Sequence, residues 1–198
     1  MAQPNERWYN VQEVALIRAP RYLPALANMT AGYPVSVGPA RIQSTEHLYQ
    51  ASKLRHEARA AVLEAPTARA AKDAAHLAQE PWHPEWHVIR LPVMRWCLAI
   101  KLLQHWESLA PLLAETKQLA IVEWSRKDEF WGAVPREDGS LAGQNQLGAL
   151  WEELRAGAIA GGQAAIAALA SPPGALRGPW AWPDARAPAP SRGRRRAP

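Results

Sequence analysis

An acid, an amide and an amine fall at helical spacing in one short segment. Glu46, Gln50 and Lys53 occupy positions i, i+4 and i+7 of the stretch TEHLYQASKLRH, which places them within about 40° of one line on a helix. A carboxylate beside an amine can stabilise a developing positive charge or assist nucleophilic attack. A solvent-exposed stripe with a weak contact between Glu46 and Gln50 has the same spacing, so the pattern alone leaves both interpretations open.

A second acid lies in the segment WSRKDEFWG, residues 124–132. Asp128 stands there between basic and aromatic neighbours. A large apolar ring beside a carboxyl group can tune its pKa for acid or base work, and the indole of Trp131 offers a flat face to a purine or pyrimidine. The alternative is a loop that packs on the core through Phe130 and Trp131. The GQNQLG segment, residues 143–148, has an Asn that can bind a sugar or phosphate, although alone it is typical of a turn before a helix.

Several other kinds of site are disfavoured. His83 and His87 are four residues apart, but Pro84 intervenes and no third metal ligand is suitably spaced. The chain has neither of the glycine-rich phosphate-loop patterns nor the GxSxG pattern of serine hydrolases. Cys97 falls within an apolar periodic helix, which favours a core thiol over a nucleophile.

The same cysteine, with the lack of long apolar runs, indicates the compartment. A lone Cys97 cannot form an internal disulfide, which favours a reducing environment. No run of about 18 apolar residues exists, and residues 1–8 lack the basic and apolar segments of a secretory signal. These features predict a cytoplasmic protein without a membrane contact.

The elements that must position these residues are mostly helical. The longest apolar periodicity runs from Trp86 to Leu103 with spacings of 3 and 4, but Pro92 interrupts it, so the helix either begins near residue 91 or is kinked there. Shorter helices are predicted at Thr45–His56, Ala58–Glu64, Thr67–Ala78, Leu147–Arg155 and Ile159–Ala170. The apolar segments 33–37 and 119–124 predict strands of a small sheet. The expected class is α+β, helix-dominated, with one domain over residues 1–170.

The last 28 residues differ from the rest in charge and in proline content. Residues 171–198 hold six arginines against one aspartate, which leaves 17 basic and 17 acidic groups in residues 1–170. Seven prolines predict that this tail is disordered. It is either a solvated extension or an arm whose Arg192–Arg196 run touches nucleic-acid phosphates. Trp180 and Trp182 are unusual for pure disorder, and they either dock on the domain or stack on a base.

Four ordered motifs, spread over about residues 26–155, resemble those of the NADAR family (NAD and ADP-ribose related, also called YbiA-like). The first motif is an LAN triplet with a Tyr-Pro pair after it, and the second is TEHLYQASKL. The third is a Trp followed by a Val-Met pair and a Lys. The fourth begins with Val-Glu, continues through an Asp and the triplet FWG, and ends with Leu-Arg. In this chain they are Leu26–Asn28 with Tyr33–Pro34; Thr45–Leu54; Trp86 with Val93–Met94 and Lys101; and Val122–Glu123, Asp128, Phe130–Gly132, Gly143, Asn145, Leu147–Gly148 and Leu154–Arg155. Departures at Met29, Leu48, Leu54 and Pro92 concern pocket shape more than chemistry.

The resemblance implies a YbiA-like fold and an N-glycosidase that acts on a ribosylated base without metal or cofactor. Two family activities are implied: removal of ADP-ribose from guanine in nucleic acid, which reverses the action of an ADP-ribosyltransferase toxin, and hydrolysis of phosphoribosylamino-pyrimidine intermediates of riboflavin synthesis. The stretches MRWCLAIKLLQ and SRKDEFWGA, with the PREDGSLAGQN insert, look like the toxin-linked branch. The expected function is therefore that of an antitoxin, with DNA and a cognate toxin as partners.

The resemblance also implies roles for individual residues. Glu46 stabilises charge on the sugar, Asp128 positions water or transfers a proton, and Lys53 either pairs with phosphate or attacks the sugar to give a Schiff base. The implied substrate-binding residues, which wall the base or hold oxygens, are Asn28, Tyr49, Gln50, Trp86, Trp131, Gly132 and Asn145. The rival hypotheses are a non-catalytic ADP-ribose or nucleic-acid binding module and a Trp-rich interaction domain. Deletion of residues 171–198 is expected to impair only an enzyme that acts on DNA.

Overall fold

The structure, a computed structural model, describes residues 5–17 and 23–183, and its centre is the long helix α4 (Trp86–Gln104). Its apolar repeat gives a buried face on which Val93, Trp96 and Ile100 are at most 1% exposed. The helix starts before Pro92 and continues through it. The proline has no N–H for the carbonyl of Val88, whose residue lies on the exposed face, so solvent can hydrate that carbonyl.

Helix α1 (Thr45–Ala51) packs against α4, and it is shorter than the predicted 45–56 helix. The Ser44 side chain caps its first turn, where the backbone N–H of His47 is the donor. Side chains add donors to the last carbonyls of the helix. The Ser52 hydroxyl donates to the carbonyl of Leu48, and the Arg59 side chain donates to the carbonyl of Ala51.

Three small elements follow α1 and cover its outer side. They are the 3-10 helix η2 (His56–Ala58), α2 (Ala60–Leu63) and α3 (Ala68–Leu77). The Thr67 hydroxyl caps α3 by accepting from the N–H of Ala70, so the predicted helix start is confirmed. Val62 of α2 and the buried alanines of α3 form a second, smaller core with the end of α1.

Three separate small sheets replace the single sheet that the sequence predicts. The first is antiparallel, with order β1-β7-β6; the second is a parallel pair of β2 and β5; the third is an antiparallel pair of β3 and β4. The predicted strands 33–37 and 119–124 contain β3 and β5, but these belong to different sheets. The strands are β1 (Arg7–Tyr9), β2 (Val14–Leu16), β3 (Val35–Val37), β4 (Ala40–Ile42), β5 (Ala120–Val122), β6 (Val134–Pro135) and β7 (Leu141–Gly143).

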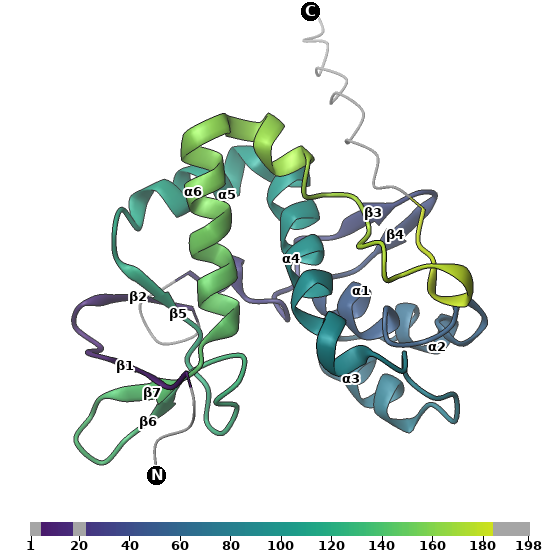
Figure 1. Cartoon of the computed structure of the whole chain (residues 1–198), viewed down its shortest axis with the longest axis horizontal. Helices are drawn as coiled ribbons and strands as arrows, with labels where there is room; N and C mark the ends of the chain where they lie inside the picture. The colour runs from purple at the N-terminus through teal and green to yellow at the C-terminus, as the bar shows by residue number, and fades with distance from the viewer. Residues whose placement is uncertain (1–4, 18–22, 184–198) are drawn as a thin grey trace, which may run out of the picture.

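The second long helix, α6 (Gln146–Ala167), runs beside α4 (Figure 1). It spans most of the two helices predicted at 147–155 and 159–170, and Gly162, with a φ of +59°, interrupts its regular backbone. Between α4 and β5 the chain forms α5 (Trp106–Glu115), which the sequence analysis did not predict. The α+β, helix-dominated class is confirmed.

The C-terminal segment departs from the sequence expectation. Residues 171–183 follow the outer side of the domain and include the 3-10 helix η3 (Gly178–Trp180) (Figure 1). Trp180 and Trp182 pack against the main core cluster, as in the docking alternative, because burial of two indoles offsets the cost of ordering the segment. The Arg192–Arg196 run lies outside the described residues. None of the helices in residues 5–17 and 23–183 is long and apolar enough to cross a membrane.

Candidate active site

The carboxylate of Glu46 lies in the first turn of α1, between two side-chain amides. The Gln50 amide donates to Glu46 Oε1 at 2.7 Å, and Asn28 Nδ2 lies 3.5 Å from Glu46 Oε2. All three residues are at most 7% exposed. The exposed-stripe interpretation is therefore wrong for Glu46 and Gln50, although their predicted contact exists.

Both of these amides keep a buried oxygen that accepts no hydrogen bond in the described part of the chain. The atoms are Asn28 Oδ1 and Gln50 Oε1. Each amide turns its N–H side toward the Glu46 carboxylate, which can only accept, and Asn28 Nδ2 also donates to Met94 Sδ at 2.9 Å. Since buried acceptors are usually satisfied, two such oxygens beside one carboxylate suit a ligand that brings hydroxyl donors.

The loop that carries Asn28 is fixed to the helices on both sides of it. The backbone carbonyl of Asn28 accepts from the N–H of Glu46, which satisfies a free donor at the start of α1. The fully buried Lys101 of α4 donates to the neighbouring Ala27 carbonyl at 2.9 Å. Burial lowers the pKa of Lys101 to about 7. Asn28 thus reaches Glu46 from a backbone that α1 and α4 hold in place.

Tyr49 forms an aromatic wall next to Glu46. Its ring lies 5.1 Å from that of Trp86 and 5.6 Å from that of Trp131. Burial, followed by the charge of Glu46 and more weakly that of Asp128, raises the pKa of the Tyr49 hydroxyl. The predicted residues from α1, α4 and the 124–132 loop therefore meet around one ring.

Lys53 lies in the turn after α1, and it is 5% exposed. Its Nζ is 4.0 Å from the ring centre of Trp82 and 5.7 Å from those of Tyr49 and Trp86. The pKa of Lys53 is lowered to about 8, chiefly by burial; the charge of Glu46 opposes this effect, and the charge of Lys72 adds to it. Such an amine is partly neutral near pH 8, as a nucleophile must be.

Asp128 uses one of its oxygens to shape its own loop. Oδ1 accepts from the backbone N–H groups of Phe130 and Trp131 at 3.1 and 2.9 Å. The side chain of Ser125 accepts from the N–H of Asp128. These bonds place Trp131 against Tyr49, so the carboxylate both borders the site and supports one of its walls.

Asn145 and Gly132 pack against the backbone of β5 and the residue after it. The Asn145 side chain accepts from the N–H of Glu123 at 3.0 Å and donates to the carbonyl of Ile121 at 2.8 Å and to the hydroxyl of Tyr9 at 3.2 Å. A Cβ on Gly132 would lie 2.3 Å from the carbonyl oxygen of Glu123. These contacts give both residues a role in strand packing, and the substrate contacts that the sequence analysis expected of them stay a prediction.

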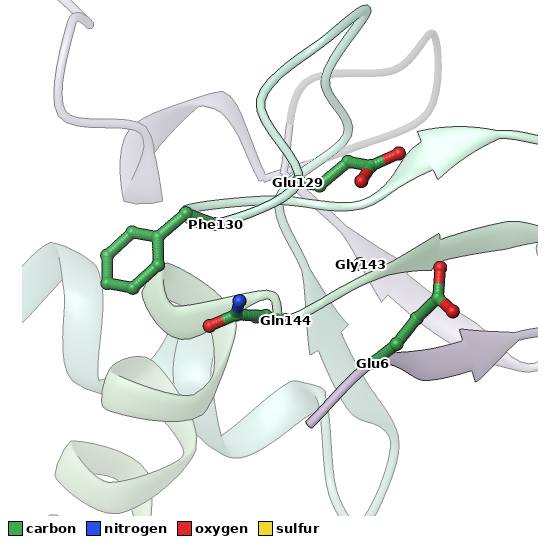
Figure 2. A pocket seen from close by; sticks show the side chains of 5 residues that line it. All are labelled: Glu6, Glu129, Phe130, Gly143 and Gln144. Atoms are coloured by element: carbon green, nitrogen blue, oxygen red, sulfur yellow. The ribbon is translucent and has the colours of Figure 1, made fainter. Parts of the chain in front are cut away.

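A pocket of about 240 Å³ is lined by Glu6, Glu129, Phe130, Gly143 and Gln144 (Figure 2). Figure 2 shows the carboxylates of Glu6 and Glu129 on one side of it and the Phe130 ring on the other. Arg136 pairs with both carboxylates, at 2.6 and 3.0 Å. Neither Glu46 nor Lys53 lines this pocket, so it is separate from the candidate active site.

Sequence reasoning missed three residues around the site. Trp82 covers the Lys53 amine, Arg90 lies 3.5 Å from the ring centre of Phe130, and Arg59 binds the backbone of the Lys53 turn. Trp82 immediately precedes His83 in the sequence, and no spacing pattern relates it to Lys53. In residues 5–17 and 23–183 no group of three His, Cys, Asp or Glu residues is placed to hold a metal ion.

Comparisons with known proteins agree with this arrangement. Residues 24–157 match the family model described as the NADAR domain. A protein of Escherichia coli (strain K12) named N-glycosidase YbiA is 33% identical over 130 residues, which are 63% of this chain and 76% of that protein. A Vibrio vulnificus (strain YJ016) protein named for riboflavin biosynthesis is 36% identical over 106 residues, which are 53% of this chain and 28% of that protein. The NMR structure of Escherichia coli YbiA matches with a TM-score of 0.61 and 26% identity, over 75% of this chain and 86% of that chain.

Proposed function

Because the chain belongs to the NADAR domain family, we propose that it is an N-glycosidase that hydrolyses the bond between ADP-ribose and guanine in nucleic acid. The observation that carries the proposal is the buried Glu46 carboxylate beside two amide oxygens, of Asn28 and Gln50, that accept no hydrogen bond in the described residues. A ribose offers the hydroxyl donors that such oxygens need.

The chemistry of the reaction suits a buried carboxylate. When the bond between C1 of the ribose and the base nitrogen breaks, positive charge develops on the sugar. A carboxylate held in a site of low dielectric stabilises that charge more than it would in water. Water then adds to C1, and its proton balances the one that the departing base takes up. Glu46 has this electrostatic role.

Lys53 provides a covalent route for the same overall reaction. Its neutral amine attacks C1 of the ring-opened sugar, the base leaves, and a C=N bond forms between Nζ and C1. Water hydrolyses this Schiff base and returns the free sugar and the free amine. The low pKa of Lys53, about 8, and the three surrounding rings favour this role over that of a permanent phosphate ligand.

The remaining residues have supporting roles. Asp128 positions the water or transfers a proton, since Oδ1 alone is engaged by the Phe130 and Trp131 amides. Tyr49, Trp86 and Trp131 form the aromatic wall against which the base stacks. No cofactor has a role in this scheme.

The choice of ADP-ribosylated guanine rests on the resemblance of residues 94–104 and 125–145 to the toxin-linked branch. Under this proposal the partner system includes a cognate ADP-ribosyltransferase, and residues 184–198, with five arginines, contact the nucleic acid. The name of the Vibrio vulnificus relative favours a second candidate substrate, a phosphoribosylamino-pyrimidine of riboflavin synthesis.

The decisive experiment offers both substrates to the purified chain. We expect free ADP-ribose to appear from an ADP-ribosylated guanine oligonucleotide, as measured by the masses of the products. Release of ribose 5-phosphate from the riboflavin-pathway compound alone would select the second candidate. Binding of ADP-ribose without cleavage of either substrate would instead favour a non-catalytic module.

The role of the arginine-rich end is tested by deletion of residues 184–198. The deletion begins at residue 184, and not at 171, because residues 171–183 pack on the domain. An enzyme that acts on nucleic acid should lose affinity for the oligonucleotide, with a weaker salt dependence. An enzyme for a small nucleotide should be unaffected.

A further inference from the structure

Residues 171–183, here named the C-terminal strap, lie outside residues 24–157 that match the family. The strap crosses from the end of α6 toward the 3-10 helix η2 and α2 (Figure 1). Leu176 is 5% exposed and belongs to the main core cluster, and the rings of Trp180 and Trp182 pack against that cluster. The strap is therefore attached along its length by apolar contacts.

One arginine joins the strap to the turn that carries Lys53. The side chain of Arg59 is buried, and its Nε donates to the carbonyls of Ala51 and Leu54, each at 3.1 Å. Its two terminal nitrogens donate to the strap carbonyls of Trp180 and Ala181 at 2.7 and 2.8 Å. A guanidinium can serve four carbonyls in this way because its donors diverge in one plane.

The strap adds a stacking contact to this clamp. The ring of Trp182 lies 4.1 Å from the guanidinium carbon of Arg59, a cation–π contact. The charge of Arg59 is thus enclosed between the turn on one side and the strap on the other. Burial lowers the pKa of Arg59 to about 10, so the guanidinium stays protonated at neutral pH.

A second connection reaches Lys53 itself. The backbone N–H of His83 donates to the carbonyl of Lys53 at 2.7 Å. The His83 ring, in turn, contacts the strap, since it lies 4.8 Å from the Trp180 ring and 3.3 Å from the carbonyl oxygen of Ala175. The strap therefore contacts both groups, Arg59 and His83, that hydrogen-bond the backbone from Ala51 to Leu54.

We propose that Arg59 is a positioning residue for Lys53, and that the C-terminal strap is an integral part of the site because it holds Arg59 and His83 against the Lys53 turn. Three hydrogen bonds, from Arg59 Nε to the carbonyls of Ala51 and Leu54 and from the N–H of His83 to that of Lys53, fix where the turn goes. The turn then places Nζ among the rings of Tyr49, Trp82 and Trp86. The effect on catalysis rests on the proposed function, whereas the effect on the Lys53 amine does not.

The test measures the ionisation of the Lys53 amine without any substrate. The full-length chain is labelled with acetic anhydride over a range of pH, and the modification of Lys53 is followed by mass spectrometry of its peptide. In the unmodified protein the midpoint should lie near the pKa of about 8, which reflects burial and the facing charges of Glu46 on α1 and Lys72 on α3, with His76 close by.

Replacement Arg59→Gln removes the fork that spans the turn and the strap. We expect the labelling midpoint of Lys53 to rise by about one pH unit or more, toward the ordinary value of 10.5, because a displaced amine regains water. The Arg177→Gln variant is the matched control, since Arg177 lies in the strap with an exposed side chain. Its midpoint should equal that of the unmodified chain.

A folded Arg59→Gln variant with an unchanged midpoint overturns the proposal. If Arg59→Gln does not fold, Trp182→Ala decides by the same criterion, since it loosens the strap and leaves the Arg59 side chain in place. The rate of base release is measured on the same variants. A shifted midpoint with unaltered kcat would leave the positioning intact and contradict the proposed role of Lys53 in the reaction.

Discussion

Two carboxylates, those of Glu46 and Asp128, raise the pKa of Tyr49, but their surroundings differ. Glu46, on α1, is 7% exposed and lies between two amides that keep free buried oxygens. Asp128, in the loop after β5, is partly exposed and gives one oxygen to two backbone N–H groups. An acid near a site can therefore be available to a ligand or can hold the local backbone. The kind of group that donates to it, side-chain amides for Glu46 and backbone N–H groups for Asp128, distinguishes the two cases.

The largest expected effect follows from loss of the Glu46 charge. Glu46→Gln keeps the size of the side chain and an acceptor oxygen, but the sugar cation loses its counter-charge. We expect kcat to fall by about 10³-fold, as when a preorganised electrostatic group is removed, with little change in the thermal midpoint. Glu153→Gln, an exposed acid on α6, is the control and should stay within about twofold. Retention of most activity by Glu46→Gln would contradict the proposed role.

Asn145→Ala tests the structural side of the comparison. Removal of this amide leaves the N–H of Glu123 and the carbonyl of Ile121 without their partner. We expect a loss of about 3 kcal/mol in the free energy of unfolding, measured by urea denaturation. The KM of the remaining folded enzyme should hardly change. A raised KM with normal stability would return Asn145 to the substrate-binding set.

Asp128→Asn should have a smaller effect than Glu46→Gln. The asparagine oxygen can still accept from the amides of Phe130 and Trp131, so the loop should stay in place. Only proton transfer is lost, and we expect kcat to fall by about 10²-fold, near the lower end for general acid–base catalysis. Intact tryptophan fluorescence would verify the loop. A fall equal to that of Glu46→Gln would erase the distinction between the two acids.

The smallest effect concerns pH, and it reports on Lys53. Its pKa lies below the usual value, at about 8, so the neutral amine increases as pH rises from 7 to 9. If the amine is the nucleophile, kcat/KM should rise by about tenfold over that range and then level off. A decline over the same range would indicate a charged lysine that pairs with phosphate. Trapping of the Schiff base with borohydride at Lys53 provides an independent measurement.

The sequence predicted the contact between Glu46 and Gln50 in α1 better than the length of that helix. Spacing brought Glu46 and Gln50 together correctly, because both lie within the regular helix. The helix was predicted to continue to His56, since no breaking residue follows Ala51. It ends earlier, and Ser52 and Arg59 serve its last carbonyls; the Arg59 contact lies eight residues beyond Ala51, outside the range of helix propensity.

The pairing of the strands and the docking of the strap could not be predicted either, because both depend on contacts between residues distant in the sequence. Strands of two or three residues, such as β6, have no readable alternation, and their pairing is decided by distant backbone. Proline content predicted a disordered tail, whereas residues 171–183 pack on the domain, because a count of prolines does not show whether Trp180 and Trp182 dock. Asn145 was likewise predicted to bind substrate, because a sequence does not show which groups an amide hydrogen-bonds in the folded chain.

The position of the strap in the chain has a consequence for synthesis. The strap carbonyls that Arg59 binds belong to Trp180 and Ala181, which follow Arg59 in the sequence by 121 and 122 positions. At about 5–20 residues per second, the ribosome adds them roughly 6 to 24 seconds after Arg59 itself. The turn that carries Lys53 is thus made several seconds before the strap carbonyls that hold Arg59. A nascent or prematurely terminated chain would carry the reactive lysine without the support that gives it its properties.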